Sequence, residues 1–164
     1  MKKPFSCLII LQILFLFSSC NKDRNQILLF DFSTPSDLEE WNVIGDGTAS
    51  IDSGVIYFSN ISSCFHLDLK ELIDIRKNRS YKIKISSKNN PSQIGNPAYC
   101  LGNLMVGIKQ DGETILMEGT SSGLDFTEQQ YTFTTISASP IQLKLMVGTI
   151  NGAWVDHISI EKAY

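Results

Sequence analysis

The sequence has only two histidines among its 164 residues, which limits the catalytic sites it can form. His66 and His157 lack the spacing of paired metal ligands such as HExxH, and no P-loop, GxSxG or GxGxxG motif occurs. Cys64 and His66 would share one face of a strand, but no third group is placed to orient them as nucleophile and base. We therefore expect a domain that is not an enzyme.

The sequence also lacks an excess of positive charge. Lysine and arginine total 14 against 17 aspartates and glutamates, for a formal net charge of −3. The cationic residues are scattered rather than clustered, so no surface for nucleic acid is predicted. Charged residues make up 19% of the chain, which is low for a helical surface and typical of a β protein rich in serine, threonine and asparagine.

Long apolar runs are absent except near the N-terminus. Residues 2–3 are lysines, and Leu8–Phe17 is apolar apart from Gln12, a run too short to span a bilayer. Two serines then precede Cys20. This arrangement resembles a bacterial lipoprotein signal, which implies that residues 1–19 are removed and that Cys20 carries acyl chains, palmitate among them. An ordinary cleaved signal or a short anchor helix is the alternative.

The polar residues 20–26 predict a short lipidated tether ahead of a single domain over residues 27–164. The charged stretch after Cys20 also resembles the surface-export signals of Bacteroidetes lipoproteins. The resemblance implies an outer-membrane or cell-surface protein held by lipid rather than by a spanning helix. After cleavage the mature chain would keep two cysteines in addition to the lipidated one. Cys64 and Cys100 would form either a disulfide or two buried thiols.

Alternation of apolar and polar residues dominates the rest of the chain and predicts β-strands. The runs with this period of two are 27–32, 81–86, 103–109, 131–135, 141–147 and 154–160. Asp111-Gly112 and Asn151-Gly152 each lie between two such runs and predict hairpins. The one predicted helix is Pro35–Glu40. Many short strands with such turns predict an all-β protein, a β-sandwich of the jelly-roll type.

Both ends of the domain resemble one known family. Residues 29–32 with 37–41 are similar to the opening strand and tryptophan turn of galactose-binding-like jelly rolls, and residues 153–160 are similar to their closing strand. The resemblance covers about residues 27–162. The family includes many carbohydrate-binding modules of bacterial glycan-degrading systems, and the fold hosts other functions as well. It implies a domain that binds a glycan without catalysis.

The closing strand also suggests a metal site. Alternation places Trp154, Asp156, Ile158 and Ile160 on one face, toward the core, where a buried carboxylate needs donors or a cation. Relatives place a structural calcium where the first and last strands meet, so the resemblance implies calcium held by Asp156 with Asp31. The alternative is that Asp156 caps backbone amides at a strand end.

Three groups of residues are candidate glycan contacts. Trp41 and Trp154 would be stacking platforms or, more commonly, core residues. The loop 86–99 supplies amides and an aromatic ring, and it is either a binding loop or a plain connector. The ligand-binding residues that we predict are Tyr99, Asn96, Asn103 and Gln93. A further set would form an exposed sheet face: Asn103, Met105, Gln142, Lys144 and His157.

The sequence therefore predicts a membrane-anchored lipoprotein whose jelly-roll domain binds a polysaccharide or oligosaccharide at the cell surface. Partner proteins of a glycan-uptake system would be further ligands, and nucleic acid would not. The alternative is a structural or protein-interaction lipoprotein with no sugar ligand, in which the same domain packs against partner subunits.

Overall fold

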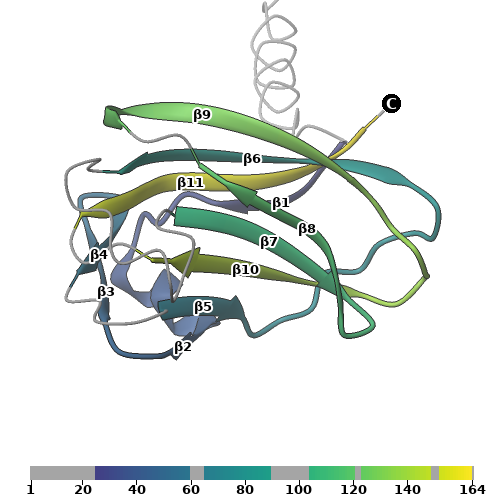
Figure 1. Cartoon of the computed structure of the whole chain (residues 1–164), viewed down its shortest axis with the longest axis horizontal. Coiled ribbons are helices and arrows are strands. Elements are labelled where there is room, and N and C mark those ends of the chain that lie inside the picture. The colour runs from purple at the N-terminus through teal and green to yellow at the C-terminus, as the bar shows by residue number, and fades with distance from the viewer. Residues whose placement is uncertain (1–24, 60–64, 90–103, 121–122, 149–151, 164) are drawn as a thin grey trace, which may run out of the picture.

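The computed structural model describes residues 25–59, 65–89, 104–120, 123–148 and 152–163 (Figure 1). A short 3-10 helix, η1 (Pro35–Glu40), follows the first strand, and all other elements are strands. The strands are β1 (Gln26–Phe30), β2 (Trp41–Ile44), β3 (Thr48–Asp52), β4 (Val55–Ser59), β5 (Phe65–Leu69), β6 (Ser80–Asn89), β7 (Leu104–Gln110), β8 (Glu113–Gly119), β9 (Gly123–Thr134), β10 (Ile141–Val147) and β11 (Ala153–Lys162).

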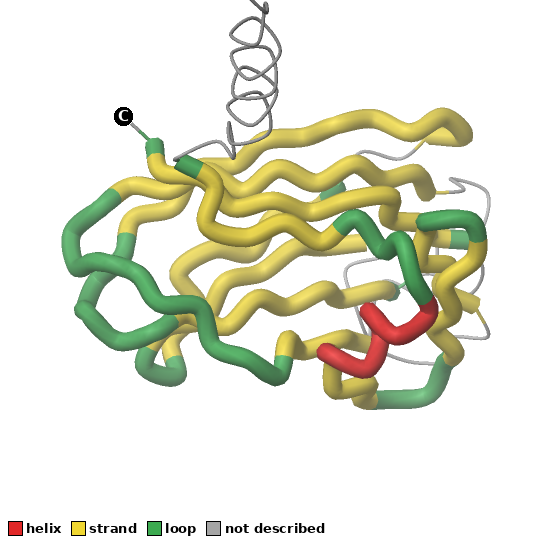
Figure 2. The backbone as a smooth tube through the Cα atoms, turned by 180° about the vertical axis from the view of Figure 1, so that it is seen from behind, coloured by secondary structure: helices red, strands yellow, loops and turns green. Residues whose placement is uncertain are grey.

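The strands form two antiparallel sheets that face each other (Figures 1 and 2). The six-stranded sheet has the order β3-β4-β11-β6-β9, and β1 also pairs with β11. The five-stranded sheet has the order β2-β5-β10-β7-β8. The predicted all-β sandwich of the jelly-roll type is therefore confirmed.

The core lies between the sheets because alternate residues of each strand point inward. Tyr81, Ile83 and Ile85 of β6 are buried as the alternation predicts, and so are the odd-numbered residues of β10. Phe58 of β4 meets Phe65 of β5 across the sandwich, with ring centroids 6.1 Å apart in an edge-on arrangement. Side chains from both sheets thus fill one apolar layer.

The opening segment also packs into this layer. Trp41 is only 2% exposed, and its ring lies 5.2 Å from that of Phe30. The predicted helix over Pro35–Glu40 is present as a 3-10 turn, in which the Thr34 amide donates to Asp37 Oδ2 at 2.9 Å. Trp41 is therefore a core residue rather than a platform for sugar.

One of the two predicted hairpins is confirmed and the other is wrong. Asp111 and Gly112 connect β7 to β8, with φ of 52° and 84° as a tight two-residue turn requires. Asn151-Gly152 does not form a hairpin, because β10 and β11 lie in different sheets. Both edges of β10 are already paired, to β5 and β7, so the following strand joins the other sheet.

The predicted faces of the last strand are wrong over its first half. Val155 pairs with Ser87 and His157 with Ser86, so Asp156 is one extra residue, a β-bulge. The bulge changes which residues point inward: Val155, Ile158 and Ile160 are fully buried, while Trp154 and Asp156 are partly exposed. Sequence alternation alone does not show such an insertion.

Residues 1–24 lie outside the described residues, and with them the predicted signal, Cys20 and most of the tether. Cys64 and Cys100 lie outside them as well, so their pairing stays open. β1 begins at Gln26, the last residue of the predicted tether. Over the parts of the chain that the structure describes, no helix is long and apolar enough to cross a membrane.

Candidate functional site

The four predicted ligand residues, Gln93, Asn96, Tyr99 and Asn103, lie outside the described residues. The first four residues of the predicted loop, 86–89, belong instead to β6, which extends to Asn89 and pairs on both edges, with β11 and β9. Asn89 is buried, and its Nδ2 donates to Thr120 Oγ1 at 2.8 Å. Its amide therefore serves the interior of the domain.

The predicted polar sheet face is confirmed in part. Met105, Gln142 and Lys144 lie together on the outer face of the five-stranded sheet, but His157 lies in the other sheet. Lys144 is paired with Asp68 of β5, with Nζ 3.2 Å from Oδ1, and its side chain is only 10% exposed. Partial burial and, after it, the charge of Lys144 lower the pKa of His66 from its usual value.

This face is poorly suited to stacking on a sugar ring. Among its described residues, no phenylalanine, tyrosine or tryptophan points outward. Met105 is buried opposite Met146, and Met117 lies over Gly107, within 2.9 Å of where a Cβ would stand. Its apolar side chains are thus aliphatic or methionine, and Lys144 is paired with Asp68.

The two predicted calcium ligands lie at the surface. Asp31 is exposed, and its Oδ1 accepts a hydrogen bond from the Ser33 amide at 3.2 Å. The Asp156 side chain is 47% exposed, and its Oδ2 lies 3.0 Å from His157 Nδ1. Within the described residues, no group of three or more histidines, cysteines or carboxylates is placed to hold a metal ion. The calcium site stays a prediction.

A group of aromatic side chains lies on the outer face of the six-stranded sheet. Tyr57 of β4 and Trp154 of β11 are cross-strand neighbours, with rings stacked at 5.0 Å and an interplanar angle of 26°. Lys88 of β6 pairs with Trp154 on its other side, and its Nζ lies 4.9 Å from the Trp154 ring and 4.7 Å from the Phe126 ring. We call Tyr57, Trp154, Lys88 and Phe126 the aromatic row.

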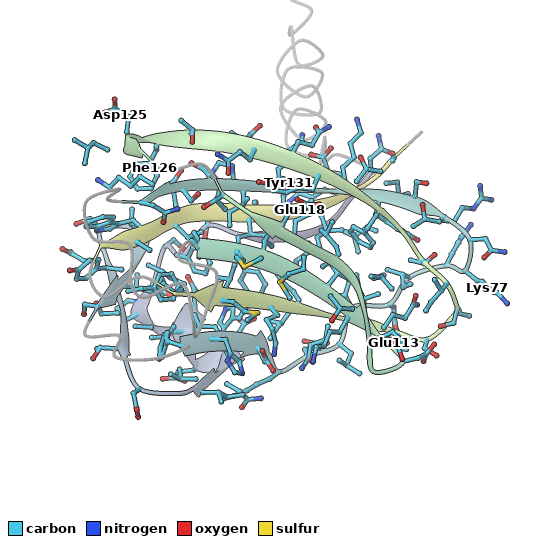
Figure 3. The ribbon with its side chains drawn as sticks, viewed as in Figure 1. Lys77, Glu113, Glu118, Asp125, Phe126 and Tyr131 are labelled. Atoms are coloured by element: carbon cyan, nitrogen blue, oxygen red, sulfur yellow. The ribbon has the colours of Figure 1, made fainter. Side chains whose placement is uncertain are left out.

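The aromatic row is held by ring–ring and cation–π contacts and remains partly open to solvent. Tyr57 and Trp154 are partly exposed, and Phe126 is 39% exposed. Figure 3 shows Phe126 and Asp125 at the start of β9, at one end of the molecule. Tyr57 stacks on the Trp154 indole, and Lys88 Nζ lies over the rings of Trp154 and Phe126. A ligand would therefore contact the parts of the Trp154 and Phe126 rings that these two side chains leave exposed.

Acidic groups and a histidine lie beside the aromatic row. His157 follows Trp154 by three residues on β11 and lies between two carboxylates, with Nδ1 3.0 Å from Asp156 Oδ2 and Nε2 3.2 Å from Glu128 Oε2. These groups accept and donate hydrogen bonds at the surface. A sugar has apolar C–H groups and polar hydroxyls. The rings can contact the C–H groups while the neighbouring polar groups form hydrogen bonds with the hydroxyls.

Sequence reasoning missed most of the aromatic row. Tyr57, Lys88 and Phe126 were not predicted, because they come from three strands whose pairing is not visible in the sequence. Trp154 was weighed as a platform and set aside as a core residue, because its alternation was counted without the bulge. A local signal is Phe126, an aromatic residue of β9 that is followed by four polar residues, 127–130.

Comparison with solved structures identifies the fold. A xylan-binding domain (CBM22-1) from Paenibacillus barcinonensis has a TM-score of 0.58 and 12% identity, covering 84% of this chain and 94% of that chain. The C-terminal CBM6 of the laminarinase LamC from Zobellia galactanivorans has a TM-score of 0.55 and 14% identity, covering 82% of this chain and 98% of that chain. A CBM6 of lichenase 5A from Cellvibrio mixtus, in complex with cellotriose, has a TM-score of 0.51 and 16% identity, covering 85% of this chain and 99% of that chain.

Sequence comparison adds nothing to this: no protein-family model matches the chain, and no curated protein matches it either. At these identities the structural likeness establishes the architecture alone. The chain has the β-sandwich fold found in carbohydrate-binding modules.

Proposed function

We propose that this protein is a non-catalytic glycan-binding domain, held at a membrane surface by lipid on Cys20. The aromatic row carries the proposal, because three partly exposed rings lie on one sheet face beside hydrogen-bonding groups. Ring surface of this kind stacks against the apolar faces of sugars. The similar structures support it, since their names describe modules that bind xylan or hold cellotriose.

The charges around the aromatic row favour a neutral polysaccharide. Three carboxylates, on Asp125, Glu128 and Asp156, lie on β9 and β11, the two strands that flank Lys88 in β6. An acidic polysaccharide would be repelled by this excess of negative charge, whereas neutral hydroxyls donate to carboxylates and accept from Lys88.

The predicted loop ligands are a second part of the proposal. β6 ends at Asn89, one residue beyond Lys88, and the chain then continues through Gln93, Asn96 and Tyr99 to Asn103. The loop that contains them leaves β6 beside Lys88, and this position in the sequence is the ground for including them. We propose them as the polar complement of the aromatic row, with Tyr99 as a further ring.

The anchor is proposed from the N-terminal sequence. Acyl chains on Cys20 would place the domain on the outer membrane or at the cell surface, where a bound polysaccharide would be kept close to the cell. Proteins of a glycan-uptake system are the natural partners for such a domain.

Titration against a panel of neutral and acidic polysaccharides tests glycan binding. We expect a neutral polysaccharide to bind, and Phe126→Ala to weaken its affinity about five- to tenfold, the value of one aromatic contact. Trp154→Ala should weaken it at least as much. Ile136→Ala removes another exposed apolar side chain, outside the row, and should leave the affinity unchanged. Equal affinities in all four proteins would contradict the assignment of the site.

A protein-interaction role is the second candidate, and a groove favours it. The groove, about 320 Å³ in volume, lies between β1 and residues 69–74, with Phe30 and Ile73 in its floor and Leu72 exposed at its rim. Among the described strands, β1 pairs with β11 alone, so its other edge is available to an added strand. No binding by the wild-type protein to any polysaccharide would favour this role.

A further inference from the structure

Three cationic side chains surround a small pocket at the end of the sandwich where β6 begins and β11 ends. Arg76, Arg79 and Lys162 line this pocket of about 170 Å³ together with Ser80, Tyr81 and Ala163. All three cations are exposed, and no carboxylate is among the lining residues. Within the described residues, none of the three forms an ion pair. We call these three residues the basic end.

The backbone that carries the basic end is held in place by buried groups. The buried Thr135 hydroxyl donates to the Arg76 carbonyl at 2.6 Å and accepts from the Arg79 amide at 3.1 Å. The Tyr81 hydroxyl accepts from the Arg76 amide at 2.9 Å. The backbone of both arginines is therefore fixed, and only their side chains have to become ordered when they bind an anion. This reduces the entropy lost on binding.

The chain enters the domain beside the basic end. The Lys162 amide donates to the Asn25 carbonyl at 3.0 Å, so the first described residue lies next to one of the three cations. Cys20 precedes Asn25 by five residues, which span about 18 Å at full extension. A lipid on Cys20 would therefore hold the basic end within about two Debye lengths of the membrane at physiological salt.

We propose, resting on the lipid anchor proposed above, that the basic end binds the phosphate groups of anionic lipids in the membrane that holds Cys20. A compact pocket with three cations and no acid in its lining suits a phosphate, and the tether brings that chemistry within reach. In this arrangement the basic end of the domain contacts the membrane and the opposite end points away from it. Lys77, next to the basic end, and Phe126 lie at opposite ends of the molecule (Figure 3).

This orientation would present the aromatic row to a glycan outside the membrane. Lys88 of β6 and Arg79, the residue before β6, are nine residues apart, about 30 Å in an extended strand. The lipid contact and the glycan site are thus separated by the length of the sandwich, and neither would block the other.

Lysine acetylation of the mature full-length protein in vesicles tests the proposal. The protein is reconstituted in phosphatidylcholine alone or with one third phosphatidylglycerol, and the mass of the Cys20 peptide reports acylation in the same samples. We expect Lys162 and Lys77 to react several-fold more slowly on the anionic vesicles, and Lys70 and Lys88 to react equally on both. High salt should remove the protection.

A matched pair of variants locates the contact. Arg76→Gln with Arg79→Gln should weaken the lipid contact by about 25-fold, at about fivefold for each charge near an anionic surface, and should therefore remove the protection of Lys162. Lys70→Gln with Lys88→Gln removes the same charge away from the basic end and should leave the protection of Lys162 unchanged. An equal loss of protection in both variants would mean a general effect of net charge, and the assigned contact would be wrong.

The acylation readout separates this proposal from the anchor. Acylated Cys20 with an unprotected Lys162 would overturn the phosphate contact and leave the anchor standing. An unmodified Cys20 with a protected Lys162 would support the contact and overturn the anchor. An unmodified Cys20 with an unprotected Lys162 would overturn both.

Discussion

Phe58→Ala should destabilise the domain by about 3–5 kcal/mol, one of the largest effects expected of a single truncation. Phe58 is fully buried on the inner face of β4 and meets Phe65 of the opposite sheet at 6.1 Å. Its removal leaves a cavity between two sheets whose strands are fixed by their own hydrogen bonds and cannot close over it. A urea unfolding transition measures the change in the free energy of unfolding.

The control for this prediction is Ile136→Ala, since Ile136 is a half-exposed apolar residue. Its truncation should change the free energy of unfolding by no more than about 0.5 kcal/mol. A Phe58→Ala protein as stable as this control would mean that the two sheets do not pack at this position. The near-absence of charge from the inner faces makes that packing the main source of stability.

The strands with regular alternation could be predicted from the sequence, because a half-buried sheet imposes a period of two on its residues. Tyr81, Ile83 and Ile85 lie inward as expected, and so do the odd-numbered residues of β10. The Asp111-Gly112 turn was also predictable, since positive φ at both positions is a local requirement.

Strand partners and the aromatic row could not be predicted in this way. Asn151-Gly152 has the local signal of a hairpin, but the edges of β10 are occupied by distant strands. The aromatic row needs β4, β11, β6 and β9 side by side in one sheet, and their residues Tyr57, Trp154 and Phe126 are far apart in the sequence. Pairing between distant segments decides both features, and one sequence does not record it.

The bulge at Asp156 is the feature on which the aromatic row depends most. Counting back from Ile158 and Ile160 without a bulge places Trp154 inward and Val155 outward. With the extra residue, Val155 is fully buried beside Ile56, and Trp154 stacks on Tyr57 at the surface. One added residue thus converts a predicted core tryptophan into part of a candidate binding surface.

Val155→Asp and Trp154→Asp together test this arrangement, and they should differ widely. A carboxylate at Val155 would lie in the apolar core between Ile56 and Ser87, at a cost of several kcal/mol that approaches the total stability of such a domain. We expect Val155→Asp to be unfolded or close to it by circular dichroism and thermal melting. Val155→Ala, which adds no charge, should cost about 2 kcal/mol.

Trp154→Asp should remain folded, because the new carboxylate would face solvent near Lys88 and the ring contacts with Tyr57 and Lys88, about 1 kcal/mol each, are small beside the stability of a domain. The same variant should bind polysaccharide poorly, since the centre of the aromatic row is gone. The opposite result, with Trp154→Asp unfolded and Val155→Asp stable, is what regular alternation requires. It would contradict the bulge at Asp156, and therefore also the aromatic row on which the glycan-binding proposal rests.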